Sequence, residues 1–183
     1  MRVISGILKG REILGYNING TRPTMDRVKE SIFSMIQNKL FHSVVLDLFA
    51  GSGNYGIECI SQNAKFVYFN DKNKECIKVI KKNLVKFQIL DKARILNMDY
   101  LMCLKFLMKE GIKFDLVFLD PPYKEHILES ILKFLVENNL LVNGALIITE
   151  FMEEQLKNEY GNLKMIKTRN YGEKKVFIYE YIS

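Results

Sequence analysis

Hydrophobic positions change their spacing repeatedly between residue 44 and the C-terminus. Short apolar runs, typical of buried strands, alternate with stretches in which apolar residues recur every three or four positions, as on one face of a helix. The apolar runs predict strands over residues 44–49, 66–70, 93–97, 115–119 and 145–150. The helical stretches lie at 55–62, 74–87, 100–109, 126–138 and 153–160. Strands that alternate with helices in this way pair in parallel, so the order predicts a doubly wound α/β sheet.

The two ends of the chain add further elements. Residues 2–5 and 11–14 predict two short strands that turn near Gly10, and a helical stripe follows over residues 25–40. The last segment, 163–182, predicts an antiparallel hairpin that turns at Gly172. We therefore expect a single domain over 1–183. Its sheet is mostly parallel and seven-stranded, ends in the antiparallel hairpin, and carries a small N-terminal β-hairpin extension over 1–22.

Composition fits a globular domain. Hydrophobic residues make up 48% of the 183 positions and charged residues 26%, a balance that argues against disorder. No apolar run approaches the roughly 20 residues that span a bilayer, and the N-terminus lacks the pattern of a signal peptide. The three cysteines form no CxxC pair, so we expect reduced, buried thiols, a cytoplasmic location and no metal site.

Basic residues outnumber acidic ones. A net charge of +6 and a pI near 9.1 favour an anionic partner such as nucleic acid, although a solvated lysine-rich surface explains them equally well. The solvated reading suits the predicted helix at 74–87. Six lysines lie in or just before it: Lys72, Lys74, Lys78, Lys81, Lys82 and Lys86.

A glycine-rich segment, "DLFAGSGNYG", joins the first core strand to its helix. Gly51, Gly53 and Gly56 match the G-x-G-x-x-G pattern, in which glycines let the backbone approach a nucleotide-like ligand. Asp71 stands at the tip of the following strand, where a carboxylate can accept hydrogen bonds from both ribose hydroxyls. The glycines alone would be compatible with a tight turn, but together with Asp71 they indicate a bound adenosyl group.

The acids nearby distinguish between adenosyl ligands. Asp47, just before the glycines, is unfavourable beside the pyrophosphate of NAD but favourable beside the ammonium group of S-adenosylmethionine. Asp99, after the third strand, is placed to accept a hydrogen bond from the adenine amine. Simpler roles exist for both residues: Asp47 as a cap for the glycine loop, and Asp99 as the N-cap of a helix.

A rigid corner, "DPPY", follows the fourth core strand. In doubly wound sheets the first and fourth strands are neighbours, so this corner should face the glycine loop across the crevice where ligands bind. Asp120 and the carbonyl of Pro121 can accept both hydrogens of an exocyclic amine, Pro122 stiffens the corner, and Tyr123 offers a face on which a base can stack. Such acceptors localise the nitrogen lone pair towards a methyl donor, which suits methyl transfer to a flipped nucleobase.

These motifs resemble those of class I S-adenosylmethionine-dependent methyltransferases that methylate amines. The N-terminal blocks "RVISGILKGREI" and "TRPTMDRVKESIF", together with "YGEKKVFIYEY", resemble the RsmD family over nearly the whole chain. The resemblance implies methylation of the N2 amine of a guanine in 16S ribosomal RNA, within an assembled or nearly assembled small subunit, by a protein we expect to be a monomer. It implies three groups of site residues: Asp47, Phe49, Ala50, Gly51, Gly53, Asp71 and Asp99 for the cofactor; Asp120, Pro121, Pro122 and Tyr123 for catalysis; and Arg22 near the active-site mouth.

The first thirty residues have a basic character, from which we predict contacts between the N-terminal hairpin and the RNA backbone. The opposing interpretation is that the hairpin only packs on the sheet while its cations remain solvated. The predicted RNA-binding residues are Lys9, Arg11 and Arg22, and the surrounding cations are Arg2, Arg27 and Lys29.

Three other functions are weaker hypotheses. An adenine-N6 methyltransferase acting on DNA would usually carry a separate target-recognition region, for which this chain has no room. An NAD-dependent oxidoreductase would need a proton-relay pair such as Tyr-x-x-x-Lys and would leave the "DPPY" corner without a role. A nucleic-acid-binding module without activity would have no use for Asp71 and Asp120 together. Physical reasoning does not separate guanine from adenine, because both bases offer a similar exocyclic amine.

Overall fold

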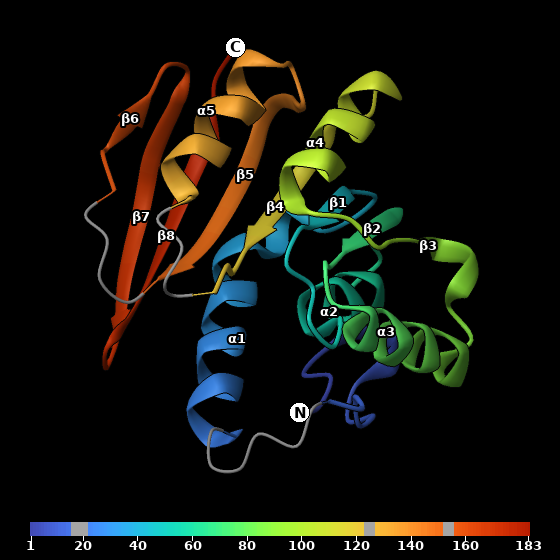
Figure 1. Cartoon of the computed structure of the whole chain (residues 1–183). Coiled ribbons are helices and arrows are strands. Elements are labelled where there is room, and N and C mark those ends of the chain that lie inside the picture. Colours follow the sequence, from blue (N-terminus) through green and yellow to red (C-terminus); the bar gives the residue numbers. More distant parts are fainter. Residues whose placement is uncertain (16–21, 123–126, 152–155) are drawn as a thin grey trace.

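The computed structural model describes residues 1–15, 22–122, 127–151 and 156–183, with only the backbone described at 22–25. Five α-helices lie in this part of the chain, and Figure 1 shows them around a central sheet. The helices are α1 (Arg22–Ile36), α2 (Asn54–Ser61), α3 (Lys74–Phe87), α4 (Tyr100–Lys109) and α5 (Leu128–Glu137). Short 3₁₀ turns occupy Gly6–Leu8, Gln37–Lys39 and Leu90–Lys92.

The sheet has eight strands in the order β3-β2-β1-β4-β5-β8-β7-β6. Strands β1 to β5 pair in parallel, and β8, β7 and β6 continue the sheet in antiparallel pairs. The bounds are β1 (Val44–Asp47), β2 (Phe66–Asn70), β3 (Ala93–Leu96), β4 (Phe114–Leu119), β5 (Leu141–Phe151), β6 (Glu159–Tyr160), β7 (Leu163–Tyr171) and β8 (Lys174–Tyr181). The predicted α/β class, the neighbouring first and fourth strands and the hairpin around Gly172 are confirmed.

The helix predicted at 153–160 is wrong at its C-terminal end, which the structure describes. We expected helix over 153–160, but residues 159–160 form β6, an eighth strand at the sheet edge. Tyr160 pairs with Leu163 across Gly161 and Asn162, and Gly161 has a φ of 59°. Gly-Asn between two short strands is a hairpin signal, and here it outweighs the helical spacing of the apolar residues.

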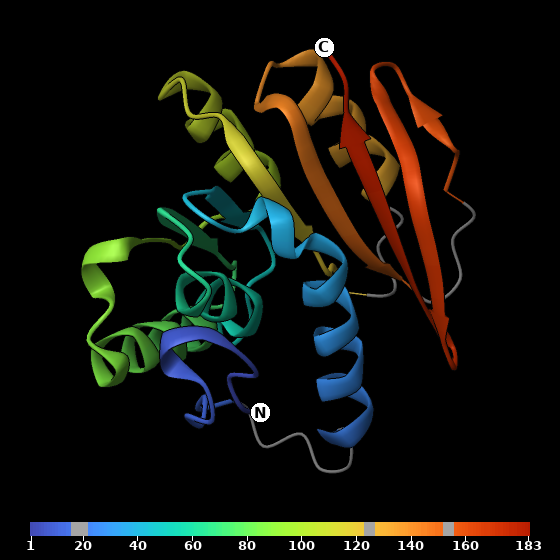
Figure 2. The same ribbon diagram turned by 180° about the vertical axis from the view of Figure 1, so that it is seen from behind.

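Two hydrophobic cores lie on opposite faces of the sheet, which gives three layers (Figures 1 and 2). Helices α1, α2 and α3 cover one face, and α4 and α5 cover the other. Neighbouring strand residues alternate between these cores: Val45 belongs to the first and Leu46 to the second. Burial on both faces explains why the parallel strands read as continuous apolar runs.

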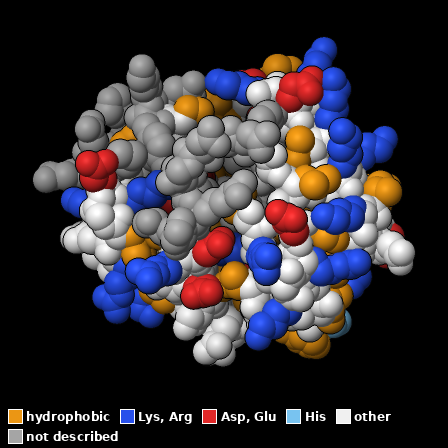
Figure 3. All heavy atoms as spheres, turned by 90° about the horizontal axis from the view of Figure 1, so that it is seen from below, with side chains coloured by type: hydrophobic (Ala, Val, Ile, Leu, Met, Phe, Trp, Pro, Cys, Tyr) orange, Lys and Arg blue, Asp and Glu red, His pale blue; other side chains and the backbone are white. Residues whose placement is uncertain are grey.

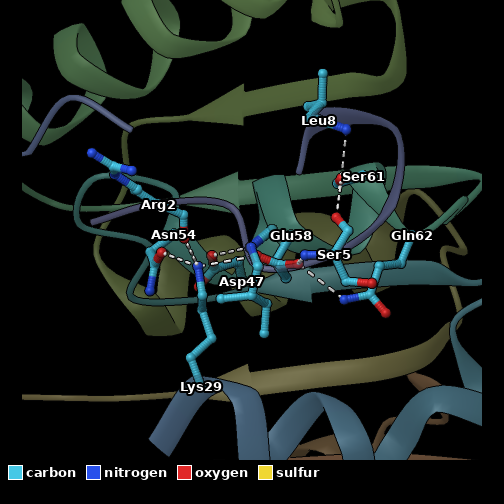
Figure 4. A network of polar contacts seen from close by, with 11 residues as sticks. Arg2, Ser5, Leu8, Lys29, Asp47, Asn54, Glu58, Ser61 and Gln62 are labelled. Carbon is cyan, nitrogen blue, oxygen red and sulfur yellow. Dashed lines mark hydrogen bonds and ion pairs between the residues drawn. The ribbon is translucent and has the colours of Figure 1, made fainter. Parts of the chain in front are cut away.

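The N-terminal segment differs from the predicted hairpin of two strands. Its two arms meet at a single bridge, Arg2 with Glu12, and Gly6–Leu8 form a 3₁₀ turn. The backbone amides of Ile4 and Ser5 donate instead to the carboxylate of Glu58 on α2, each at 2.9 Å. Because α2 takes these donors, they are unavailable for a longer ladder. Figure 4 shows this segment against α2.

Gly6 is required where the N-terminal segment touches α2. Its φ is +80°, and a Cβ atom there would lie 1.8 Å from the carbonyl oxygen of Ser61. The Ser61 hydroxyl completes the contact, accepting from the amide of Leu8 and donating to the carbonyl of Ser5. The segment is therefore an integral part of the domain rather than an appendage.

The α3 lysines and the cysteines behave as predicted. Lys74, Lys78, Lys81, Lys82 and Lys86 are exposed, and the face in Figure 3 carries many Lys and Arg side chains on the side of α3. Cys59, Cys76 and Cys103 are buried and form no disulfide. None of the described helices combines the length and apolarity of a membrane span.

Candidate active site

The glycine loop and the Asp120 corner meet at the C-terminal edge of two adjacent strands. Strands β1 and β4 pair in parallel, with Asp47 opposite Phe118. Beyond the ladder, the Leu48 amide still donates to the Phe118 carbonyl at 3.2 Å. The predicted crevice between these two strand ends is therefore present, at the place where open α/β sheets bind ligands.

A cavity of about 310 Å³ lies at this edge, within the range of small-molecule sites. Its lining contains most of the predicted catalytic and cofactor residues. The lining residues are Phe49, Gly51, Asn70, Asp71, Lys72, Tyr100, Asp120, Pro121 and Pro122. Of the predicted set, Asp47, Ala50, Gly53 and Asp99 lie outside this lining, and Tyr123 lies outside the described residues.

The three motif glycines have different physical roles. Gly51 has a φ of +54°, and a Cβ atom there would meet no heavy atom within 4 Å, so it borders open space. Gly53 is the N-cap of α2 with a φ of 83°. At Gly56 a Cβ atom would lie 2.2 Å from the ring of Phe69, so this glycine lets α2 pack closely on β2. Only Gly51 keeps backbone accessible at the cavity.

Asp71 ties the loop to the end of β2. One carboxylate oxygen accepts from the Gly51 amide at 2.9 Å, and the other accepts from the Asn73 amide at 2.8 Å. The same side chain lines the cavity. It thus holds the glycine loop in place while offering remaining lone pairs to a ligand.

Asp47 lies behind the loop rather than in the cavity. Asp47 is only 2% exposed, and its carboxylate accepts a hydrogen bond from the Gly56 amide at 3.0 Å. It therefore caps the glycine loop, the simpler of its two expected roles. The pKa of Asp47 is raised to about 7, chiefly because the carboxyl is buried; the Gly56 hydrogen bond opposes this rise, and the charges of Asp120 and Asp71 add to it. Three carboxyl groups therefore share one electrostatic environment.

Asp120 occupies the corner after β4. Burial raises the pKa of the Asp120 carboxyl, and the positive charge of Lys174 on β8 lowers it. Pro121 is buried and Pro122 is exposed, so the corner runs from the sheet to the surface. Below it, the ring of Tyr55 stacks on Phe118, with centroids 5.1 Å apart, and supports the strand end.

Sequence reasoning missed three lining residues: Asn70, Lys72 and Tyr100. Asn70 is 1% exposed, and its amide group donates to the carbonyls of Leu48 and Met98, which joins three strand ends. The ring of Tyr100 lies 5.9 Å from that of Phe49. The available signal was position: Asn70 and Lys72 flank Asp71, and Tyr100 follows Asp99.

Asp99 takes the simpler of its two expected roles in this structure. It is the N-cap of α4, and its carboxylate accepts from the Leu101 amide at 3.0 Å. The predicted adenine contact remains a prediction.

Two of the predicted RNA-binding cations, Lys9 and Arg11, lie outside the cavity lining. Lys9 and Arg11 are exposed on the N-terminal segment, and the Arg11 guanidinium lies 5.2 Å from the ring centre of Phe87 on α3. The side chain of Arg22 is outside the described residues. Lys29, which we counted among the surrounding cations, does not belong to the basic surface. It is fully buried in an ion pair with Glu58, so it is unavailable to RNA.

Among the residues that the structure describes, His, Cys, Asp and Glu side chains form no cluster of three or more that would hold a metal ion.

Known proteins similar to this chain are named as methyltransferases, and most of the chain matches one family model. The family model described as "Conserved hypothetical protein 95" matches residues 1–180. YlbH of Bacillus subtilis, provisionally named an rRNA methyltransferase, is 38% identical over 98% of both chains. Ribosomal RNA small subunit methyltransferase D of Haemophilus influenzae is 36% identical over 94% of this chain and 89% of its own.

A solved structure shows the same architecture. The Escherichia coli protein yhhF, provisionally named a methyltransferase, superposes with a TM-score of 0.86 and 28% identity, covering 100% of this chain and 98% of its own. The match includes the N-terminal segment, which the general α/β pattern does not require. The chain belongs to the Conserved hypothetical protein 95 family, the RsmD family of small-subunit rRNA methyltransferases.

Proposed function

We propose that this protein transfers a methyl group from S-adenosylmethionine to the N2 amine of a guanine in small-subunit ribosomal RNA. The observation that carries the proposal is the shared cavity: Gly51 and Asp71 border it on one side, and Asp120 and Pro121 on the other. Relatives named as ribosomal RNA small subunit methyltransferase D support the substrate class.

The charges around the cavity favour S-adenosylmethionine over a dinucleotide. Asp71 and Asp120 lie close enough to Asp47 for their negative charges to raise its pKa. Such a cluster would repel a pyrophosphate, whereas it would stabilise an ammonium and a sulfonium group. Gly51 would let the ligand approach the backbone, and Asp71 would accept from the ribose hydroxyls. Phe49 and Tyr100 offer aromatic faces for the adenine.

The Asp120 corner would position the amine. When bound, S-adenosylmethionine supplies an electrophilic methyl group on a positively charged sulfur. An amine held at this corner would attack that methyl carbon in line, with sulfur as the leaving atom that takes the electron pair of the broken bond. Asp120 and the Pro121 carbonyl accept hydrogen bonds from the amine, so alignment provides much of the catalysis. Asp120 also stabilises the positive charge that develops on nitrogen before the proton leaves.

The wider setting is part of the same proposal. We infer that the protein acts as a monomer in the cytoplasm, on a small subunit that is assembled or nearly assembled. A subunit would present the target nucleotide in a fixed shape.

Methyl transfer with a tritiated donor tests the proposal directly. Naked ribosomal RNA and small subunits from a strain lacking the modification serve as substrates, and the products are digested to nucleosides. Label in N2-methylguanosine is the expected result. Label in N6-methyladenosine would move the assignment to adenine. Calorimetric binding of NAD but not of S-adenosylmethionine would overturn it.

A further inference from the structure

A second carboxylate lies level with Asp120 on the neighbouring strand. Strands β4 and β5 pair in parallel with Leu119 opposite Thr149, so the next residues, Asp120 and Glu150, stand side by side at the strand ends. Phe118 and Ile148, two positions earlier, belong to the same core. Side chains alternate along a strand, so Asp120 and Glu150 are directed to the same face of the sheet.

A cation from β8 joins the pair. Glu150 pairs with Val176, and Lys174 lies two residues before Val176 on the same face. The Lys174 ammonium lies 3.2 Å from the Glu150 Oε2 atom, and it also lowers the pKa of the Asp120 carboxyl. Burial raises the pKa of both the Asp120 and the Glu150 carboxyl groups, and the one Lys174 ammonium opposes that rise at each of them.

Glu150 has an unused acceptor. The residue is 3% exposed, and its Oε1 atom is buried without a hydrogen-bond partner among the described residues. A buried carboxylate oxygen without a donor is costly, and such an atom in a native protein calls for an explanation. The missing partner should be a hydrogen-bond donor that enters beside the Asp120 corner, because Glu150 lies one strand away from Asp120 and just outside the cavity lining.

Guanine carries such a donor and adenine does not. In guanine the N1–H group is adjacent to the N2 amine, so the two groups can donate to two neighbouring carboxylates. In adenine the ring nitrogen next to the amine is a bare acceptor, which a carboxylate repels. We propose that Glu150 accepts the N1–H group of the target guanine through Oε1 and so excludes adenine, while Lys174 holds Glu150 in place. This inference rests on the proposed function.

A substrate analogue tests the contact without altering the protein. 2-Aminopurine has the same exocyclic amine as guanine, but its N1 atom carries no hydrogen. RNA with 2-aminopurine at the methylated position should be a poorer substrate by about 10- to 100-fold in kcat/KM, because Glu150 would be left unpaired or would be repelled. Equal rates on guanine and 2-aminopurine would overturn the proposal.

A substitution provides the complementary measurement. The side-chain amide of Glu150→Gln can turn its NH₂ group towards a bare N1 atom, so the preference for guanine over 2-aminopurine should fall by about tenfold or more. A purely structural role predicts equal losses on both substrates, and that result would overturn the proposal. Glu180→Gln is the control, because Glu180 pairs with Lys39 at 3.6 Å on the same sheet and should leave the preference unchanged.

The two proposals fail in different ways. If the wild-type protein methylates no RNA, the proposed function is wrong. If it methylates guanine but accepts 2-aminopurine equally well, only the role of Glu150 is wrong. Should Glu150→Gln fail to fold, the analogue measurement on the wild-type protein still decides.

Discussion

Lys29 Nζ lies 3.0 Å from Glu58 Oε2, and both side chains are shielded from solvent, at 1% and 0% exposure. The ammonium also donates to the Arg2 carbonyl at 2.7 Å and to the Asn54 side chain at 2.9 Å. Its three donors are thus all used, and the pair connects α1, α2 and the N-terminal segment. A buried pair is tolerable only when its hydrogen bonds are complete, as they are here.

Breaking this pair should destabilise the protein strongly. Glu58→Gln or Lys29→Met leaves an unpaired buried charge, so we expect a loss of about 3–5 kcal/mol in the free energy of unfolding, measured with urea. Lys78→Met is the control, since Lys78 pairs with Glu75 on the surface, and it should change stability by about 0.5 kcal/mol or less. A loss below 1 kcal/mol for both buried variants would contradict the analysis.

Gly51→Ala should weaken cofactor binding more than it weakens the fold. The new methyl group would enter the cavity, and the positive φ adds strain of about 1 kcal/mol. Gly111→Ala is the matched control, because Gly111 has a φ of +67° and also borders open space, but away from the cavity lining. Both variants should lose similar stability, while only Gly51→Ala should reduce S-adenosylmethionine affinity, by about tenfold or more in calorimetry. Equal affinities would remove Gly51 from the cofactor site.

Binding of S-adenosylmethionine should depend on pH through Asp47. Its pKa is raised to about 7 without ligand, so below pH 7 the carboxyl is mostly protonated. A cationic ligand favours the charged form and lowers this pKa, so binding near pH 6.5 should release a proton. Affinity should therefore rise with pH up to about 7, by up to about tenfold per pH unit, and then level off.

Calorimetry in buffers of different ionisation enthalpy measures that proton. Asp47→Asn should bind without proton release and with a flat pH profile. If the wild-type protein shows the same affinity at pH 6 and pH 8, the cofactor cation and Asp47 are not coupled.

Asp120→Asn should separate chemistry from cofactor binding. The amide removes the negative charge that stabilises the developing cation on the amine, so methyl transfer should fall by about 10²–10³-fold. S-adenosylmethionine affinity should stay within a few-fold, measured by calorimetry on the same preparation. Asp91→Asn, at an exposed acid of the 3₁₀ turn Leu90–Lys92, controls for loss of a carboxylate. Full activity in Asp120→Asn would exclude this residue from the mechanism.

Charge reversal on the N-terminal segment tests its contact with RNA. Lys9→Glu combined with Arg11→Glu should lower RNA affinity and flatten its dependence on salt, because phosphate contacts release counterions. Lys105→Glu with Lys109→Glu is the matched control on α4, which covers the opposite face of the sheet. If the two double variants show the same affinity and the same salt slope, the N-terminal cations are solvated and serve no RNA contact.

The sequence was most informative where local chemistry determines structure. Continuous apolar strands and the alternating helices determine a parallel sheet, and that topology places Gly51 and Asp120 at one edge. The burial of Lys29 was not predictable, because its partner Glu58 is distant in sequence and a lysine on a helix usually faces water. The prediction of two N-terminal strands was wrong for a similar reason, because the amides of Ile4 and Ser5 donate to the carboxylate of Glu58, which is also distant in sequence. Predicting that Tyr100 lines the cavity would have required knowing that α4 begins beside it.

The contact between Gly6 and Ser61 has a consequence for the order of folding during synthesis. The amides of Ile4, Ser5 and Leu8 find their hydrogen-bond partners on α2, more than fifty positions later in the chain. Until that helix has been synthesised, these three amides lack their native acceptors. The segment around Gly6 must therefore be among the parts that become ordered late.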